Sequence, residues 1–263
     1  MKTNDTTEDV ETKSIIDRQR YLVVRKFFIR SFLHLIFWDI IMNRPVLRWF
    51  RRNPVQRWQK ISRSYRDLAI EMGGVLIKLG QFLSVRVDIL PREVTSELTG
   101  LLDEIPAEPI AAIINQIEED FNRPIAELFE WFSPVPLGAA SLGQVHPARL
   151  AKNHAAVVVK VLRPGIDVLV ETDLAAISLA IGWLKRYQRV SRRVDLDWLI
   201  EEFSRVTRAE LDFAAEGKNA ERFAQDFVDD AGVYFPRIYW DYCAAHTLTM
   251  ENVGYLKIAD QQA

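Results

Sequence analysis

The stretch that most restricts the fold covers residues 155–162 and reads AAVVVKVL. Valine branches at its Cβ and favours an extended backbone, so this run predicts a buried β-strand. One cation, Lys160, stands among the valines. Because burying an ammonium group without compensation costs several kcal/mol, this lysine requires a carboxylate or an anionic ligand, or it reaches water from an edge strand along its own stem. The strand alone does not distinguish these alternatives.

Helical patterns lie on both sides of this strand, which indicates an α+β fold. Apolar spacing predicts helices at residues 13–42, 46–52, 55–85, 110–119, 173–187, 195–207 and 214–228, and Pro91 opens one more. Residues 131–150 hold short β-prone pieces between proline, glycine and small residues, and further strands are expected at residues 233–240 and 246–251. The expected order is therefore helices, two or three strands, helices and two strands.

The segment before the lysine strand is a turn of small residues, PLGAASLGQVH at positions 136–146. A turn with little side-chain bulk lets backbone N–H groups approach a phosphate closely. A glycine-rich hairpin followed by a strand lysine is the protein-kinase arrangement for covering and pairing nucleotide phosphates. Here alanines replace most of the glycines, and an ordinary hairpin turn is the alternative explanation.

A kinase-like lysine also needs a carboxylate from a following helix. The segment ELDFAAE at residues 210–216 offers Glu210, Asp212 and Glu216. Asp212 and Glu216 are four residues apart and share a helical face if the helix includes both. Many acidic helix surfaces show such pairs, so this feature is not specific by itself.

Residues 247–254, TLTMENVG, resemble a kinase hinge. In that interpretation Met250 is the gatekeeper, and the carbonyl of Glu251 and the N–H of Val253 face the adenine edge. The alternative is a plain buried strand that ends at a glycine turn.

Another unusual sequence, KLGQ, occupies residues 78–81 within a helical pattern. Gly80 costs about 1 kcal/mol relative to alanine inside a helix. That cost favours close packing or a bend at this position. The alternative is a solvated helix face.

Taken together, these segments resemble the UbiB/AarF family of atypical kinases, also called the ADCK family, from about residue 68 to the C-terminus. The matching motifs are KxGQ at 78–81, SxRxDxLP at 84–91, AASLGQVH at 139–146, Lys160 with RPG at 163–165, ExD at 210–212, and Glu216 as the helix-C glutamate. The resemblance implies a protein-kinase-like N-lobe, a small antiparallel sheet with helix C, preceded by a helical KxGQ extension.

The resemblance also implies roles. Lys160 would pair the α- and β-phosphates of ATP, and Glu216 would hold Lys160. The implied nucleotide-binding residues are Lys160, Gly138, Ala139, Ala140, Ser141, Glu216, Glu251 and Val253. The implied regulatory residues, which restrict access to the site, are Lys78, Gly80, Gln81, Glu210 and Asp212. Two departures from the family pattern, Gly138 before the alanines and Gly217 after Glu216, predict a more flexible loop and a locally weaker helix.

Catalysis in a kinase-like domain needs a catalytic-loop aspartate and asparagine and a DFG aspartate for magnesium. The family's catalytic loop resembles HADPHPGN, and nothing like it occurs in these 263 residues. The C-lobe is therefore expected to be absent. No catalytic or metal-binding residue is assigned, and Mg²⁺ belongs to a full-length relative. The chain is interpreted as a fragment or as half of a split domain that a partner protein completes.

Two functions stay open at this point. One is an atypical kinase or ATPase that supports isoprenoid-quinone or prenyl-lipid metabolism. The other is a catalytically incompetent, membrane-associated protein that binds nucleotide or acts as a scaffold. Four segments are expected: a disordered tail at 1–12, a basic amphipathic helical region at 13–66, the helical KxGQ extension at 67–130, and the N-lobe at 131–263.

The charge distribution indicates which kind of partner the chain could bind. Residues 14–66 hold 13 Arg and Lys against two acids, while the whole chain has a net charge of -2. Aromatic side chains are interleaved with these cations, a combination that favours the interface of anionic bilayers. We therefore expect residues 13–66 to contact an anionic membrane surface. The alternative is a helical extension whose aromatic side chains pack on the kinase-like lobe.

Other partners and compartments are disfavoured. Nucleic-acid binding is not expected, because the basic region is rich in apolar residues and lacks a reading motif. The most apolar stretch, residues 32–42, is broken by His34 and Asp39 and is shorter than the roughly 20 residues that span a bilayer. One cysteine, Cys243, excludes a disulfide framework and suits a reducing compartment. The expected location is cytoplasmic and peripheral at a membrane.

Overall fold

A computed structural model describes residues 16–38, 42, 54–87, 90–102, 105–186, 191, 194–230 and 232–254. Its contacts divide the chain into two compact units, residues 1–105 with 165–209 and residues 106–164 with 210–263. This division differs from the four consecutive segments expected, because helices that follow the central strands pack with N-terminal helices. The tail at 1–12 and the helix predicted at 46–52 lie outside the described residues.

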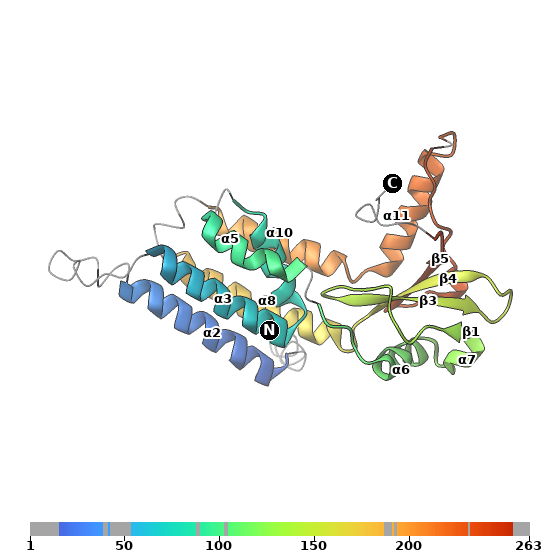
Figure 1. Cartoon of the computed structure of the whole chain (residues 1–263), viewed down its shortest axis with the longest axis horizontal. Helices are drawn as coiled ribbons and strands as arrows, with labels where there is room; N and C mark the ends of the chain where they lie inside the picture. Colours follow the sequence, from blue (N-terminus) through green and yellow to red (C-terminus); the bar gives the residue numbers. More distant parts are fainter. Residues whose placement is uncertain are drawn as a thin grey trace, which may run out of the picture. The chain divides into compact units, whose positions relative to one another are not determined.

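The first unit, here called the helical unit, contains helices throughout its described part (Figure 1). They are α2 (Arg18–Ile36), α3 (Pro54–Met72), α4 (Val75–Ser84), α5 (Arg92–Thr99), η3 (Gly100–Leu102), α8 (Ile166–Leu184) and α10 (Leu196–Ala209). Helix α8 packs along α2 and also against α10, while α3 packs against α4 and α5. The buried face of α4 illustrates the core, since Val75, Leu76 and Ile77 have no exposed surface.

The single helix predicted over residues 55–85 is wrong, because α3 and α4 are separate helices. Gly73 and Gly74 lie between them with φ of 68° and 63°. Gly74 also has ψ of -132°, a combination that residues with a Cβ rarely adopt. A Cβ on Gly74 would lie 2.4 Å from Leu169 Cδ2. The glycine pair therefore ends α3 and lets the chain turn into α4.

One buried ion pair joins three parts of the helical unit. Arg20 donates from Nε to Asp173 Oδ1 and from Nη2 to Asp173 Oδ2, each at 2.7 Å. The same guanidinium donates to the carbonyl oxygens of Met72 at 2.7 Å and Gly73 at 3.2 Å. Burial raises the pKa of Asp173, although the Arg20 hydrogen bonds oppose that shift. Arg20 thus links α2, α8 and the turn after α3.

The second unit, the sheet unit, holds all the described strands (Figure 1). Its elements are α6 (Ile110–Phe121), α7 (Ile125–Leu128), β1 (Phe129–Phe132), β2 (Gly138–Ala139), β3 (Gly143–Leu150), β4 (Ala156–Leu162), α11 (Phe213–Asp226), η4 (Trp240–Tyr242) and β5 (Thr247–Glu251). The antiparallel sheet has the order β1-β3-β4-β5, and β2 pairs with β3. The α+β class and the small antiparallel sheet are therefore confirmed.

The predicted valine-rich strand corresponds to β4, whereas the strand predicted at residues 233–240 is wrong. That segment forms only an isolated bridge between Ile238 and Met250 and then enters η4. Pro236 interrupts the segment, and proline has no N–H to donate to a ladder.

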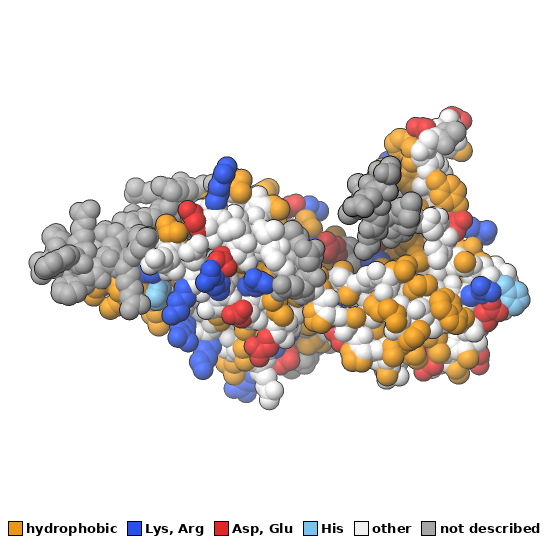
Figure 2. All heavy atoms as spheres, in the orientation of Figure 1, with side chains coloured by type: hydrophobic (Ala, Val, Ile, Leu, Met, Phe, Trp, Pro, Cys, Tyr) orange, Lys and Arg blue, Asp and Glu red, His pale blue; other side chains and the backbone are white. Residues whose placement is uncertain are grey.

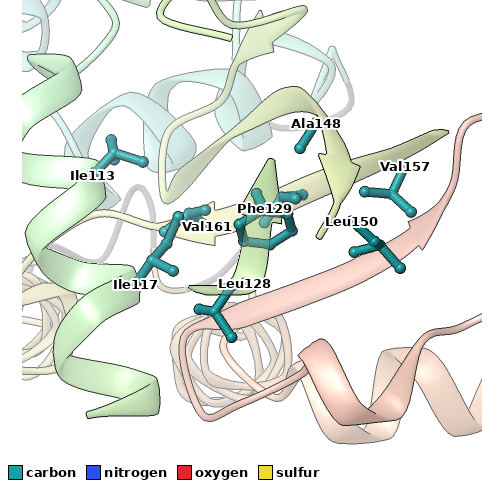
Figure 3. Packing of buried hydrophobic residues seen from close by; sticks show 9 residues of the cluster. Ile113, Ile117, Leu128, Phe129, Ala148, Leu150, Val157 and Val161 are labelled. Atoms are coloured by element: carbon teal, nitrogen blue, oxygen red, sulfur yellow. The ribbon is translucent and has the colours of Figure 1, made fainter. Parts of the chain in front are cut away.

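The core of the sheet unit lies on one face of the sheet (Figure 3). Ile113 and Ile117 of α6 pack against alternate residues of β4, namely Val157, Val159 and Val161. These five side chains have no exposed surface. Because successive strand residues point to opposite faces, the same alternation turns Lys160 away from this core.

Candidate functional site

The lysine of β4 has an acidic partner from α11. Lys160 Nζ donates to both carboxylate oxygens of Glu216, at 2.8 Å to Oε1 and 2.6 Å to Oε2. The ammonium also lies 4.8 Å from the ring centroid of Phe213, within range of a cation–π contact. Both charged side chains are partly exposed, so solvent screens the pair and it adds little to stability. Its main effect is to hold Lys160 in one orientation.

Glu216 lies in the first turn of α11, and a capping residue fixes where that helix starts. Asp212 is the N-cap, and its carboxylate accepts from Ala215 N at 2.8 Å. Helix α11 starts at Phe213 and does not include Asp212, so the condition under which Asp212 and Glu216 would share a helical face is not met. The next residue, Gly217, packs so closely that a Cβ there would lie 2.7 Å from Trp240 Cη2. Alanine at this position would require the Trp240 ring to shift.

The small-residue turn forms a hairpin between β2 and β3. Leu137 N donates to Val145 O at 2.8 Å, and Ala140 N donates to Gly143 O at 2.7 Å. A Cβ on Gly143 would lie 2.5 Å from the carbonyl oxygen of Val161, so glycine is required there. A Cβ on Gly138 would meet nothing within 4 Å, which leaves room at the start of the loop.

This hairpin and Lys160 border one cavity of about 420 Å³, which we call the loop cavity. Its described lining residues are Leu137, Gly138, Ala139, Ala140, Ser141, Leu142, Gly143, Gln144, Val145, Lys160, Leu162 and Glu210. The structure therefore brings together the four predicted loop residues, the strand lysine and one carboxylate of the ExD motif. Glu216 joins them through its ion pair with Lys160.

Arg163, of the RPG motif, holds the tip of the hairpin. Its Nη2 donates to the carbonyl oxygens of Ala140 at 3.2 Å and Pro106 at 2.7 Å. Its Nη1 forms an ion pair with Glu108, and its backbone N donates to Leu142 O at 2.9 Å. One guanidinium thus connects the loop, the end of β4 and the segment before α6. The family resemblance includes Arg163 in the RPG motif but implies no role for it.

A chain of buried polar groups supports the base of the same hairpin. Gln144 Oε1 accepts from Glu108 N at 2.8 Å, and Gln144 Nε2 lies 2.7 Å from His146 Nε2. On its other side, His146 Nδ1 lies 2.8 Å from the carbonyl oxygen of Ser133. Burial lowers the pKa of His146, so the ring is neutral. A neutral ring that donates from Nδ1 to the Ser133 oxygen and accepts at Nε2 from Gln144 satisfies both contacts.

The hinge-like residues occupy the end of β5. Met250 pairs with Val158 and Glu251 with Val157. The Glu251 carboxylate accepts from the hydroxyl of Tyr234 at 2.6 Å, a hydrogen bond that lowers the pKa of Glu251. Glu251 and Val253 are not among the described residues that line the loop cavity. Their contacts to an adenine ring stay a prediction.

The KxGQ residues lie in the helical unit. A Cβ on Gly80 would lie 2.2 Å from Leu101 Cδ1 and 3.2 Å from Tyr65 Cε1, so close packing accounts for this glycine. Gln81 Nε2 donates to the carbonyl oxygen of Leu101 at 2.9 Å. Lys78 and Gln81 also line a cavity of about 230 Å³ with Phe82, Glu202, Phe203 and Val206. Their role in restricting access to a nucleotide stays a prediction.

The residues that the structure describes lack two kinds of feature. They contain no cluster of three or more His, Cys, Asp or Glu side chains that could hold a metal ion. Within the same ranges, no helix combines the length and apolar character that crossing a bilayer requires.

Comparison with known proteins decides the family. The model of the ABC1 atypical kinase-like domain matches residues 100–263. The chain belongs to this family. The probable protein kinase UbiB of Pseudomonas aeruginosa is 30% identical over 253 residues, covering 92% of this chain and 46% of the relative. Protein ACTIVITY OF BC1 COMPLEX KINASE 8, chloroplastic, of Arabidopsis thaliana is 37% identical over 215 residues, covering 81% of this chain and 27% of the relative.

The resemblance to the UbiB/AarF family is thereby confirmed. This ABC1-family chain spans less than half the length of either curated relative. A solved structure, the complex of Rv3197 with erythromycin from Mycobacterium tuberculosis, has a TM-score of 0.49 and 27% sequence identity. The match covers 73% of this chain and 48% of the chain in that structure.

Proposed function

We propose that the sheet unit binds ATP and that the chain acts in an atypical kinase or ATPase of the UbiB type. The observation that carries this proposal is the loop cavity, where an alanine-rich hairpin faces a strand lysine held by a helix glutamate. The two curated relatives named above are called kinases, which supports the same activity class.

Each part of the loop cavity has a defined task in this proposal. Lys160 supplies a point charge for the α- and β-phosphates, and Glu216 keeps that charge in place. Gly138 to Ser141 present backbone with little side-chain bulk to the phosphates. Arg163 and Gln144 keep the hairpin in position.

The carboxylate of Glu210 disfavours a phosphate in the loop cavity. It is the one carboxylate among the described residues of the loop cavity, and its charge opposes that of a phosphate. We infer that Glu210 weakens nucleotide binding while it lines this cavity. This role agrees with the regulatory function that the family resemblance implies for the ExD motif.

The proposal extends to a cytoplasmic location at a membrane surface and to a role in isoprenoid-quinone or prenyl-lipid metabolism. Exposed apolar side chains on α2 support membrane contact, with Leu33 58% and Leu22 43% exposed beside the cations Arg18 and Lys26. Such a mixture is typical of helices that lie in the interface of anionic bilayers.

Nucleotide binding is tested by thermal shift with Mg-ATP and Mg-ADP on the wild type and Lys160→Ala. A ligand present at about 100 times its dissociation constant stabilises the folded state by roughly 2.7 kcal/mol. The matched control is Lys152→Ala, which removes an exposed lysine from the β3–β4 turn. A shift in the wild type and control that is absent in Lys160→Ala supports the proposal. No shift in any of the three favours a scaffold function instead.

A further inference from the structure

A second cavity lies in the helical unit, between α2 and α3. Its volume is about 420 Å³, within the usual range for small-molecule sites. Residues Phe27, Arg30, Ser31 and His34 of α2 line it, and their spacing places them on one face of that helix. On the α3 side, Arg57, Lys60, Ile61 and Ser64 repeat the same spacing. We call this hollow the interhelix cavity.

The composition of these two facing stripes is unusual for a helix pair. Facing positions at this spacing in a helical bundle are ordinarily apolar, because they form its core. Here Arg30, Arg57 and Lys60 converge on one hollow, and none of the described lining residues is acidic. An anion held in this hollow would interact favourably with each of these cations.

The other two described cavities lack this charge bias. The loop cavity is lined by both a cation, Lys160, and an anion, Glu210. The cavity beside the KxGQ residues is likewise lined by both Lys78 and Glu202. Figure 2 shows several Lys and Arg side chains over α2 and α3 on the face turned to the viewer. The positive bias is therefore particular to the interhelix cavity among these three.

Aromatic contacts define the sides of the interhelix cavity. Phe27 lies 5.9 Å from Tyr65 of α3, measured between ring centroids. The Arg57 guanidinium lies 5.5 Å from the ring centroid of Trp38, which follows α2. Arg57 is only 6% exposed, so a buried guanidinium forms one wall. Phe27 and Ile61 add apolar surface that an inorganic anion would leave uncovered.

We propose that the interhelix cavity binds a phosphate-bearing ligand, with Arg30, Arg57 and Lys60 contacting the phosphate and Phe27 and Ile61 contacting the organic part attached to it. Phosphate suits this set because arginine forks and lysine ammonium groups are its usual protein partners. The ligand is a soluble phosphate ester or the phosphate of a membrane lipid headgroup. This site is separate from the nucleotide site of the sheet unit and does not depend on it.

The test compares two double variants of the full chain that remove the same charge. Arg30→Gln with Lys60→Gln removes two exposed cations from the interhelix cavity, while Arg92→Gln with Arg186→Gln removes two exposed cations of the helical unit that lie outside this cavity and outside residues 13–66. The soluble probes are inorganic phosphate and glycerol 3-phosphate, measured by calorimetry. The membrane probe is phosphatidylcholine vesicles that contain phosphatidylglycerol, measured by co-sedimentation. Vesicles made equally anionic with cholesteryl hemisuccinate, which lacks phosphate, replace phosphatidylglycerol in the control.

The expected result is about tenfold or greater weakening of binding by the cavity variant and little change in the control variant, since hydrogen bonds to charged groups contribute more than neutral ones. Loss of glycerol 3-phosphate binding would identify a soluble ester, and loss of phosphatidylglycerol binding alone a lipid headgroup. Lys160→Ala should leave either result unchanged, which separates this site from the nucleotide site. Equal weakening by both double variants, equal binding of hemisuccinate vesicles, or no binding of any probe would overturn the proposal.

Discussion

Replacing Arg163 with alanine should loosen the hairpin that borders the loop cavity. The guanidinium donates to two carbonyl oxygens, those of Ala140 and Pro106, and pairs with Glu108. Hydrogen bonds from a charged donor contribute about 1.5–3 kcal/mol each, and the Glu108 pair contributes less because solvent screens it. Since the bond to Ala140 is long, we expect a local loss of about 2–4 kcal/mol.

Amide hydrogen exchange measures this loss where it occurs. The N–H of Ala140 bonds to Gly143 O, and the N–H of Arg163 bonds to Leu142 O, so both amides report on the hairpin. A loss of that size should accelerate their exchange by roughly 30-fold to 1,000-fold, while amides of the helical unit stay unchanged. Arg149→Ala is the matched control, because Arg149 is an exposed arginine of β3 paired only loosely with Glu130 at 3.4 Å.

Unchanged exchange at Ala140 in Arg163→Ala would refute the assignment of Arg163 as the residue that holds the loop. Equal acceleration in Arg149→Ala would refute it too, since the effect would then be one of net charge. Arg163→Lys should fall between the wild type and Arg163→Ala, because an ammonium group cannot reach all three acceptors at once.

Three further predictions concern other parts of the chain. Burial lowers the pKa of His146 below its ordinary value of 6.5, so the unfolded state takes up a proton first; stability should be intact above about pH 6.5 and fall below it by up to about 1.4 kcal/mol per pH unit. His146→Asn should lose this part of the slope in urea titrations, and an identical slope would contradict the assignment. Arg20→Met should destabilise the chain by about 3–5 kcal/mol because it leaves Asp173 buried without its cation, and Arg20→Met with Asp173→Leu should recover most of the loss in the same titrations. Glu210→Gln should tighten Mg-ATP binding several-fold in calorimetry, whereas weaker binding would show that Glu210 helps to hold the nucleotide.

Sequence patterns predicted best those features that depend on neighbouring residues. The valines around Lys160 predicted β4, and the helical pattern at residues 214–228 predicted most of α11. The small residues before β3 predicted a hairpin, which the structure contains. In each case the backbone preference of a short segment agrees with its final environment.

Contacts between distant residues could not be predicted from local patterns, and the Lys160–Glu216 pair was expected only because the family resemblance implied it. Arg20 pairs with Asp173, which lies about 150 residues further along the chain, and no local pattern predicts such a pair. Arg163 likewise contacts Pro106 and Ala140, which are distant in the sequence, so these contacts could not be predicted either. Two local signals do oppose the elements that were wrongly predicted. The adjacent glycines Gly73 and Gly74 suggest a turn within a helical pattern, and Pro236 argues against a strand.

The division of the chain into two interleaved units has a consequence for synthesis on the ribosome. Helix α2 packs along α8, but Ile166, where α8 starts, is translated about 130 residues after the end of α2 at Ile36. At ordinary elongation rates that interval lasts on the order of ten seconds. During this time α2 has no α8 to cover it, and Arg20 has no Asp173. The basic, aromatic-rich α2 segment of the nascent chain therefore lacks its native cover until α8 has been synthesised.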